Sequence, residues 1–227
     1  MQITPHAVLA RRGFILGLGA AGTLALSGCS SLGGLSTTEA LKRLLTLSSQ
    51  NAFAKLTAPG GFWDSEVARF DLPVLFSGSG GLLKSLLTSG PFRTELQHKL
   101  NLVAERGAER AAPVVLDSVR NISIPDALGL IRGGPTAATT WLRGQMGPAL
   151  INAMIPGLSD AIRVSSDPIL GKAIAALSGV DAAQVAQAVA NRADNSIWYQ
   201  IGAEESAIRA NPQTTHDPIL IAALKIL

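Results

Sequence analysis

Apolar side chains recur every three or four positions along most of the chain after residue 36, the spacing of one face of an α-helix. The first such segment begins at Ser36-Thr37-Thr38-Glu39, a capping box in which the serine hydroxyl and the glutamate carboxylate would bind the first free backbone amides. Pro59-Gly60-Gly61 ends it. Its inward face would comprise Leu41, Leu44, Leu45, Ser48, Ala52 and Leu56. The pattern therefore predicts a long first helix with one buried face.

Proline, glycine and aspartate divide the rest of the chain into further helices. A short helix over 82–87 would stop at Gly90, and Pro91 suits the first turn of the next helix. Pro113 should kink or split that helix, because proline removes a backbone hydrogen bond and crowds the preceding turn. Further starts are predicted at Ser123-Ile124-Pro125-Asp126, Pro135-Thr136, Asp167-Pro168, Asp181 and Asp217-Pro218, and further breaks at Gly133-Gly134, Gly144, Gly147-Pro148, Pro156-Gly157 and Asn211-Pro212.

The helix that starts at Asp181 has the longest regular pattern. Its buried stripe is predicted to be Val185, Val189, Ala193, Ile197, Ile201 and Ile208. Residues 60–81 are the irregular part, where Trp63, Phe70, Leu72, Pro73 and Phe76 should pack down on the helices. Strand-like alternation of useful length is missing, so the fold class is all-α: one bundle of amphipathic helices over 36–227.

The first 28 residues have the composition of an export signal. Arg11-Arg12 precede an apolar stretch over 13–27, which is shorter than the roughly 20 residues of a membrane span. Ala10-Arg11-Arg12-Gly13-Phe14-Ile15 is similar to the twin-arginine export motif, and general secretory export remains the alternative. Leu26-Ser27-Gly28-Cys29 then places one cysteine where a lipoprotein signal is cut and acylated. We therefore expect lipidation of Cys29, a flexible tether over 29–35, and a place on the periplasmic side of the bacterial envelope. Ser30 favours the outer membrane over the inner one.

Composition narrows the range of functions. The whole chain has 19 basic and 16 acidic residues, a net charge of +3. Removal of the signal would take Arg11 and Arg12 with it and leave 17 basic and 16 acidic residues, so the net charge of the mature chain would be +1. Nucleic-acid binding has little electrostatic support at that charge. Gly17-Leu18-Gly19-Ala20-Ala21-Gly22 has the spacing of a dinucleotide-binding loop, but it lies in the apolar signal and follows no strand, so we reject it. With Cys29 acylated no thiol remains, and we expect no cofactor.

Two blocks of residues carry a family resemblance. They are Ile124-Pro125-Asp126-Ala127, Ile131-Arg132-Gly133-Gly134, Thr136-Ala137-Ala138-Thr139 and Trp141-Leu142-Arg143, and later Glu204-Glu205 with Ala207-Ile208-Arg209-Ala210-Asn211-Pro212. In this combination the chain resembles the bacterial envelope family called domain of unknown function 4197. The resemblance implies a helical exported domain and carries no assigned activity. Pro135 stands where the family would have an aspartate, and 71–81 is richer in glycine, so an essential carboxylate at position 135 is not expected.

Few residues are candidates for chemistry. Glu204 and Glu205 could form an acid–base pair, but neighbouring helix positions point about 100° apart. An ion pair from Glu205 to Arg209 is the favoured interpretation. Thr136, Thr139 and Arg143, with Arg132 nearby, fall on one face of a helix whose start could hold an anion or a partner's carboxylate, although a polar outer face is the favoured interpretation. His98 and His216 are expected in solvent without metal, Ser79 lacks the frame of a nucleophile, and Trp141 and Trp198 should be buried.

The sequence favours a non-catalytic envelope protein, held to a membrane by its N-terminal lipid and serving as an interaction or scaffolding module for an envelope protein partner. One alternative is a carrier of an apolar ligand such as a lipid, in a groove between the broken helices of residues 135–158. A second is a hydrolase or transferase that works through Glu204 and Glu205.

Overall fold

The computed structural model describes residues 29–69, 71–72, 88–164, 167–176 and 181–225, and for residues 29–36 and 164 the backbone alone. Helices and turns make up these residues, and no strand occurs among them, which confirms the all-α class. The elements are α1 (Cys29–Leu56), α4 (Gly90–Asn121), α5 (Ala127–Ile131), α6 (Ala137–Met146), α7 (Ala149–Val164), α8 (Pro168–Ala176), α9 (Ala182–Ala210), the 3-10 helix η1 (Pro212–Thr215) and α10 (Pro218–Lys225).

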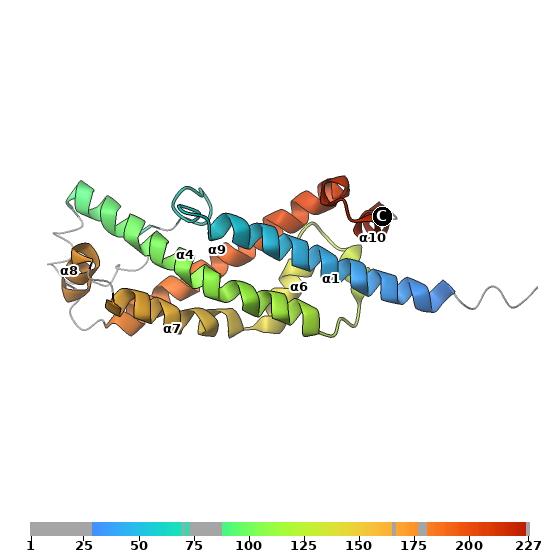
Figure 1. Ribbon diagram of the computed structural model, residues 1–227, viewed down its shortest axis with the longest axis horizontal. Coiled ribbons are helices and arrows are strands. Elements are labelled where there is room, and N and C mark those ends of the chain that lie inside the picture. The colour runs from blue at the N-terminus through green and yellow to red at the C-terminus, as the bar shows by residue number, and fades with distance from the viewer. Residues whose placement is uncertain (1–28, 70, 73–87, 165–166, 177–180, 226–227) are drawn as a thin grey trace, which may run out of the picture.

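Three long helices set the shape of the bundle. Figure 1 shows α1, α4 and α9 running along the long axis of an elongated molecule, with α7 packed against α4 and α9. The start of α1 lies at one end beside α10, and α8 lies at the opposite end. The short helices α5 and α6 pack against α1 and α9. The order of the helices thus brings the first and last described elements to the same end.

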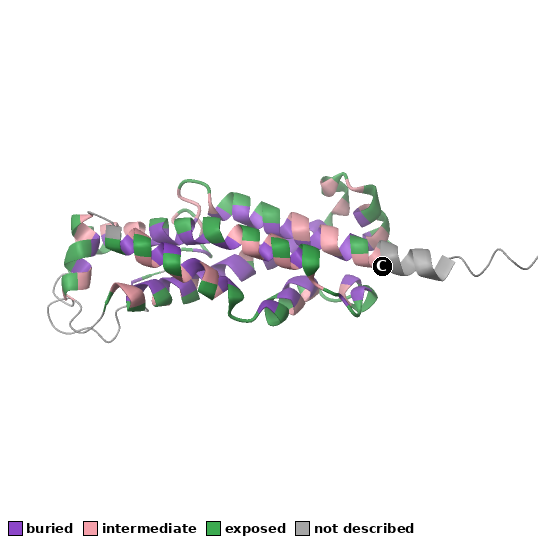
Figure 2. Cartoon of the chain, turned by 60° about the horizontal axis from the view of Figure 1, so that its bottom comes forward, coloured by how far each residue is buried: buried purple, intermediate pink, exposed green. Residues whose placement is uncertain are grey.

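The buried residues, purple in Figure 2, lie on the sides of the helices that face the axis of the bundle. Every residue of the two predicted stripes on α1 and α9 is buried. Each fully buried leucine of α1 contributes about 2 kcal/mol by leaving water. Aspartates precede α5, α8, α9 and α10 as predicted: Asp126, Asp167, Asp181 and Asp217 each accept hydrogen bonds from backbone amides of the turn that follows.

The start of α1 differs from the prediction. The helix begins at Cys29 rather than at Ser36, so residues 29–35, predicted as a flexible tether, have a helical backbone. No proline interrupts this stretch, and extension of a helix that is already packed adds one hydrogen bond for each residue fixed. The capping-box interpretation of Ser36 is therefore wrong.

Three predicted breaks do not break their helices. α4 continues through Pro113, α6 through Gly144 and α7 through Pro156. Both prolines are exposed, so the carbonyl that loses its partner can bind water instead. The break at Gly147 is present: this glycine has φ 51°, a left-handed conformation that side chains disfavour, and the chain turns there from α6 into α7.

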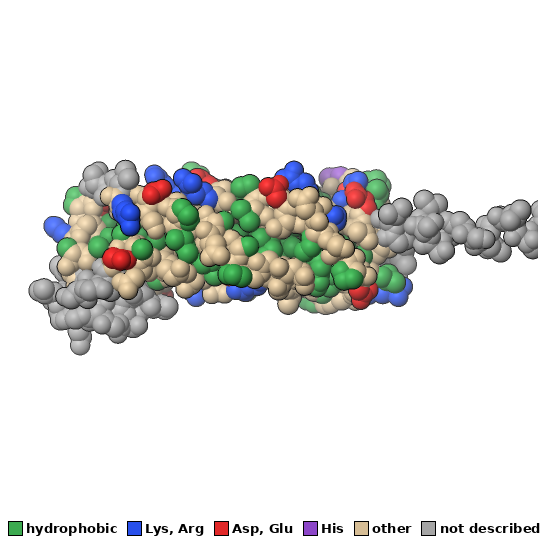
Figure 3. Space-filling view, turned by 90° about the horizontal axis from the view of Figure 1, so that it is seen from below, with side chains coloured by type: hydrophobic (Ala, Val, Ile, Leu, Met, Phe, Trp, Pro, Cys, Tyr) green, Lys and Arg blue, Asp and Glu red, His purple; other side chains and the backbone are tan. Residues whose placement is uncertain are grey.

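The underside of the molecule, as it is oriented in Figure 1, carries few charged side chains. Figure 3 shows this face, on which basic and acidic side chains lie mainly toward the margins. In the part of the chain that the structure describes, none of the helices combines the length and hydropathy that a membrane span requires.

The segment after α1 folds back onto α4. The backbone amide of Phe62 donates to Oε1 of Glu105, which is 5% exposed. Burial raises the pKa of the Glu105 carboxyl above its ordinary value. The ring of Trp63 meets the ring of His98 edge-on at 5.0 Å, so His98 is half-buried rather than solvated as predicted. Phe70, Pro73, Phe76, Ser79 and the predicted helix over 82–87 lie outside the described residues.

Gly61 is required by this fold-back. A Cβ atom there would lie 2.3 Å from the carbonyl oxygen of Lys55 and 2.6 Å from that of Leu56. We expect Gly61→Ala to lower the free energy of unfolding by about 1–3 kcal/mol, because backbone atoms must move. Urea denaturation measures it. Gly134→Ala is the control, since a Cβ at Gly134 meets nothing within 4 Å, and equal losses from both substitutions would contradict the fold-back geometry.

Candidate functional site

The buried carboxylate of Glu205 joins α9 to the first turn of α6. Its side chain is 0% exposed, Oε1 accepts a hydrogen bond from the amide of Ala138 at 3.1 Å, and Oε2 accepts one from the amide of Thr139 at 2.7 Å. The positive end of a helix favours a negative charge at this place. The helix start that could have held an external anion is therefore occupied by a carboxylate of the same chain.

Arg209 completes this arrangement, which we call the Glu205 junction. Nε of Arg209 donates to Oε1 of Glu205 at 2.8 Å, the ion pair expected from the four-residue spacing. Its Nη1 and Nη2 donate to the carbonyl oxygens of Ile131 and Leu130 at 2.6 and 2.9 Å. One guanidinium thus binds both a carboxylate of α9 and the C-terminal turn of α5.

Glu204 serves a different pair of helices. Its Oε1 accepts hydrogen bonds from Lys55 of α1 and, at 2.9 Å, from Nε2 of Gln200. The two glutamates are adjacent in sequence but bind different partners on different sides of α9. They do not share one site, which favours the structural interpretation of the pair.

Thr136, Thr139 and Arg143 line a hollow of about 690 Å³ between α6 and α9, here named the α6–α9 groove. Its other lining residues are Thr140, Asn195, Trp198, Tyr199, Gly202, Ala203 and Ser206. Thr136, Thr140 and Arg143 are exposed, whereas Thr139 is 4% exposed, so the predicted polar outer face is wrong at Thr139. This side of α6 therefore forms one wall of the groove and is not wholly exposed to solvent.

Arg143 is held in position by α9. Its Nη2 donates to Oδ2 of Asp194 at 2.8 Å and to Oδ1 of Asn195 at 2.6 Å. Oδ1 of Asp194 also accepts from Nε1 of Trp198 at 2.9 Å. Burial raises the pKa of Asp194, although Arg143 and Trp198 oppose the shift. Sequence reasoning missed Asp194; the only signal was an aspartate four residues before a tryptophan inside an apolar stripe.

The remaining predicted residues lie elsewhere. Arg132 is exposed at the end of α5 and does not line the groove. Trp198 is buried as predicted, Trp141 is half-buried, and His216 is exposed with φ 52°. Arg11 and Arg12 lie outside the described residues, and the side chain of Cys29 is not described. Among the residues described, no three histidine, cysteine, aspartate or glutamate side chains gather as a metal site would require.

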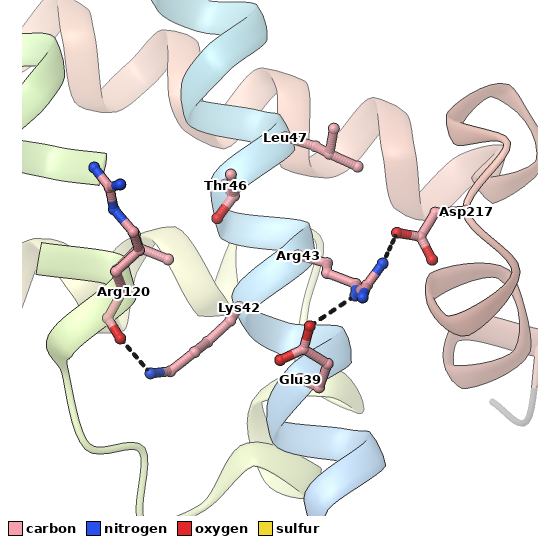
Figure 4. A pocket seen from close by; sticks show the side chains of 8 residues that line it. Glu39, Lys42, Arg43, Thr46, Leu47, Arg120 and Asp217 are labelled. Carbon is pink, nitrogen blue, oxygen red and sulfur yellow. Dashed lines mark hydrogen bonds and ion pairs between the residues drawn. The ribbon is translucent and has the colours of Figure 1, made fainter. Parts of the chain in front are cut away.

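A second hollow, of about 450 Å³, lies between α1, α4 and α10 (Figure 4). Lys42 donates to the carbonyl oxygen of Arg120 at 2.7 Å, and Arg43 binds Glu39 at 2.9 Å and Asp217 at 2.8 Å. Figure 4 shows the contacts from Lys42 to Arg120 and from Arg43 to Asp217 crossing from α1 to the elements on either side. Because these side chains already bind groups of the same chain, we interpret the contacts as a clamp that holds α1 to its neighbours.

Comparison with known proteins gives one match. A family model described as "Protein of unknown function (DUF4197)" matches residues 31–224. The chain belongs to this family. The match confirms the resemblance and covers both walls of the α6–α9 groove. No curated protein matches the chain, and no solved structure matches it.

The Glu205 junction can be tested by mutation, with the neighbouring Glu204 as the control. Glu205→Gln should lower the free energy of unfolding by about 3–5 kcal/mol, because it leaves Arg209, 10% exposed, without its counter-charge. Glu204→Gln should cost about 1 kcal/mol or less, since the partner Lys55 is 64% exposed. Chemical denaturation of both variants measures the difference. A similar cost for the two would refute the structural role.

The clamp predicts a dependence of stability on pH. The hydrogen bond from Arg43 lowers the pKa of Asp217 below its ordinary value of 3.8. A lowered pKa in the folded state stabilises the fold above pH 3.8, and that contribution is lost as the pH falls through the lowered value. Asp217→Asn, which retains a capping oxygen, should be less stable than wild type at pH 7 and equal to it near the acid end of the titration.

Thermal melting over the pH range measures this effect. Glu39→Gln is the control, because Glu39 is 52% exposed and its bond to Arg43 is screened by solvent. Curves for wild type and Asp217→Asn that run parallel at every pH would show that the carboxylate charge does not act in the clamp.

Proposed function

We propose that this DUF4197 protein is an exported, lipid-anchored protein of the bacterial envelope that acts as a non-catalytic interaction module. The observation that carries the proposal is the sequence Leu26-Ser27-Gly28-Cys29, which directly follows a short apolar stretch and precedes the helical domain. Anchoring on the periplasmic side, with the outer membrane favoured by Ser30, belongs to the same proposal.

The shape of the bundle supports this arrangement. Cys29 is the first residue of α1, and the start of α1 lies at one end of the long axis (Figure 1). A helix of 28 residues is about 42 Å long. An acylated Cys29 would therefore hold one end of the bundle at the membrane, and the sides of the long helices would stay accessible to partners.

The contacts of the two glutamates support the non-catalytic part. Glu205 is 0% exposed and Glu204 is 7% exposed, and each is bound by a cation of the chain. A general acid or base has to reach the proton that it transfers. Neither glutamate lines the open α6–α9 groove, which is therefore better suited to recognition than to proton transfer by these carboxylates.

The apolar carrier receives less support. Residues 135–158 were expected to form a groove for an apolar ligand. They lie in or next to α6 and the first part of α7, and their main apolar side chains are buried in the core. These are Leu142, Met146, Leu150, Met154 and Leu158. The hollow beside α6 has apolar lining from Trp198, Tyr199 and Ala203, but the hydroxyl groups, Asn195 and Arg143 interrupt it.

Three measurements test the proposal. Cys29→Ser should move the protein from the membrane fraction to the soluble periplasmic fraction, whereas the control Ser30→Ala should stay with the membrane. Intact-mass analysis of wild type should show a processed, acylated N-terminus. Lysine- and carboxylate-directed cross-linking over the whole surface, in intact cells, should give discrete adducts with envelope proteins. An unprocessed N-terminus, or wild type that is free of the membrane, would refute anchoring, and cross-linking without discrete adducts would refute the interaction module.

A further inference from the structure

The α6–α9 groove lies along one side of α9. Its α9 residues run from Asn195 through Tyr199 and Gly202 to Ser206, spaced by three or four positions. This places them in one row about 16 Å long. The opposite wall is the side of α6 from Thr136 to Arg143. Gly202 lies at the middle of the row. A Cβ there would lie 3.2 Å from Cγ2 of Thr136, so the absence of a side chain lets α6 approach α9 and leaves the bottom of the groove unfilled.

Arg143 is the only charged residue among the described residues of the lining. Both of its hydrogen bonds to described residues leave from Nη2, and its side chain is 44% exposed. Within the part of the chain that the structure describes, its donors Nη1 and Nε bind nothing and are open to a ligand. Because Asp194 fixes the guanidinium plane, a bound carboxylate would meet donors that are already oriented.

Thr139 adds a buried polar group to the wall of the groove. Its hydroxyl oxygen has no hydrogen-bond partner among the described residues. A buried hydroxyl without a partner costs about 1–3 kcal/mol. Because that oxygen is buried, a carbonyl or amide in the groove would reach it only after the Thr139 side chain rotates.

The composition of the lining is that of a protein-recognition surface. Tyr199 is 59% exposed and Trp198 is 3% exposed, and threonine, asparagine and serine side chains share the lining with them. Tyrosine, tryptophan and arginine are enriched at the residues that dominate protein interfaces, whereas lysine, glutamate, aspartate, serine and alanine are depleted. The described residues of the lining include all three enriched types and no lysine, glutamate or aspartate, while Ala203 and Ser206 depart from the pattern.

We infer that the α6–α9 groove binds an extended acidic segment of a partner protein and that a carboxylate of this segment binds Arg143. A row of about 16 Å accommodates about five extended residues at roughly 3.3 Å each. The low floor at Gly202 admits the backbone of the segment, and Tyr199 packs on an apolar side chain. The inference rests on the proposed function, because it identifies the surface through which the interaction module works.

The test is fluorescence anisotropy of the full chain with two labelled pentapeptide libraries. One library has Asp or Glu at one position, and the other has Asn or Gln there and is otherwise identical. The acidic library should bind at least tenfold more tightly. Arg143→Gln should remove this preference, and Tyr199→Ala should weaken binding about tenfold. Arg132→Gln is the matched control, an exposed arginine outside the groove, and should leave binding unchanged.

A blocking variant guards against loss of folding as the cause. Ala203 is exposed in the lining, so Ala203→Trp should fill the groove, abolish binding and leave the circular dichroism spectrum unchanged. Equal affinity for the two libraries, no binding by either, or binding that survives Ala203→Trp would overturn the inference. Displacement by N-acetylglucosamine oligomers in place of peptides would also overturn it and identify a glycan groove.

The outcomes separate this inference from the proposed function. If envelope adducts persist in Ala203→Trp while the peptide libraries do not bind wild type, the interaction module uses another surface and only this inference fails. If the acidic library binds but wild type is free of the membrane, the groove stands and the anchoring fails.

Discussion

The carboxylate of Glu205 lies where water does not reach it, and three helices are positioned around it. A buried charge costs several kcal/mol unless it is paired and its remaining lone pairs are bonded. Here two backbone amides of α6 and the guanidinium of Arg209 meet that requirement, and the same guanidinium binds the end of α5. Any shift of α6 along α9 would remove both amide hydrogen bonds from this buried charge, although its ion pair with Arg209 lies within α9. The start of α6 therefore has one permitted place.

A second ion pair fixes the other end of α6. Arg143 in its last turn binds Asp194 of α9, so α6 is held against α9 at both ends. Between the two pairs lies Gly202, which sets how closely the helices approach. The α6–α9 groove is thus bounded by rigid contacts on a rigid helix. A hollow with walls held in this way keeps its shape without a ligand, which lowers the entropic cost of binding.

The features that depend on neighbouring residues could be predicted from sequence. The aspartate caps and the buried stripes of α1 and α9 follow from local hydrogen bonding and helical spacing. Local rules failed at Pro113, because exposure and flanking contacts let the helix continue. They could not pair Arg143 with Asp194, 51 positions away, or Glu105 with the amide of Phe62, 43 positions away. Such pairs depend on how whole helices meet, and no spacing along the chain encodes that.

If the protein is anchored as proposed, a small groove would suit it for a physical reason. A site for about five residues buries much less than the roughly 1,200–2,000 Å² of a stable protein interface, so its own affinity is weak. Two molecules confined to one envelope, however, meet at an effective concentration on the order of millimolar. A weak site is then occupied, and it still exchanges partners quickly because its dissociation is fast. A rigid, shallow groove beside Arg143 is what a tethered recognition module requires, whereas the same groove on a free protein would stay largely empty.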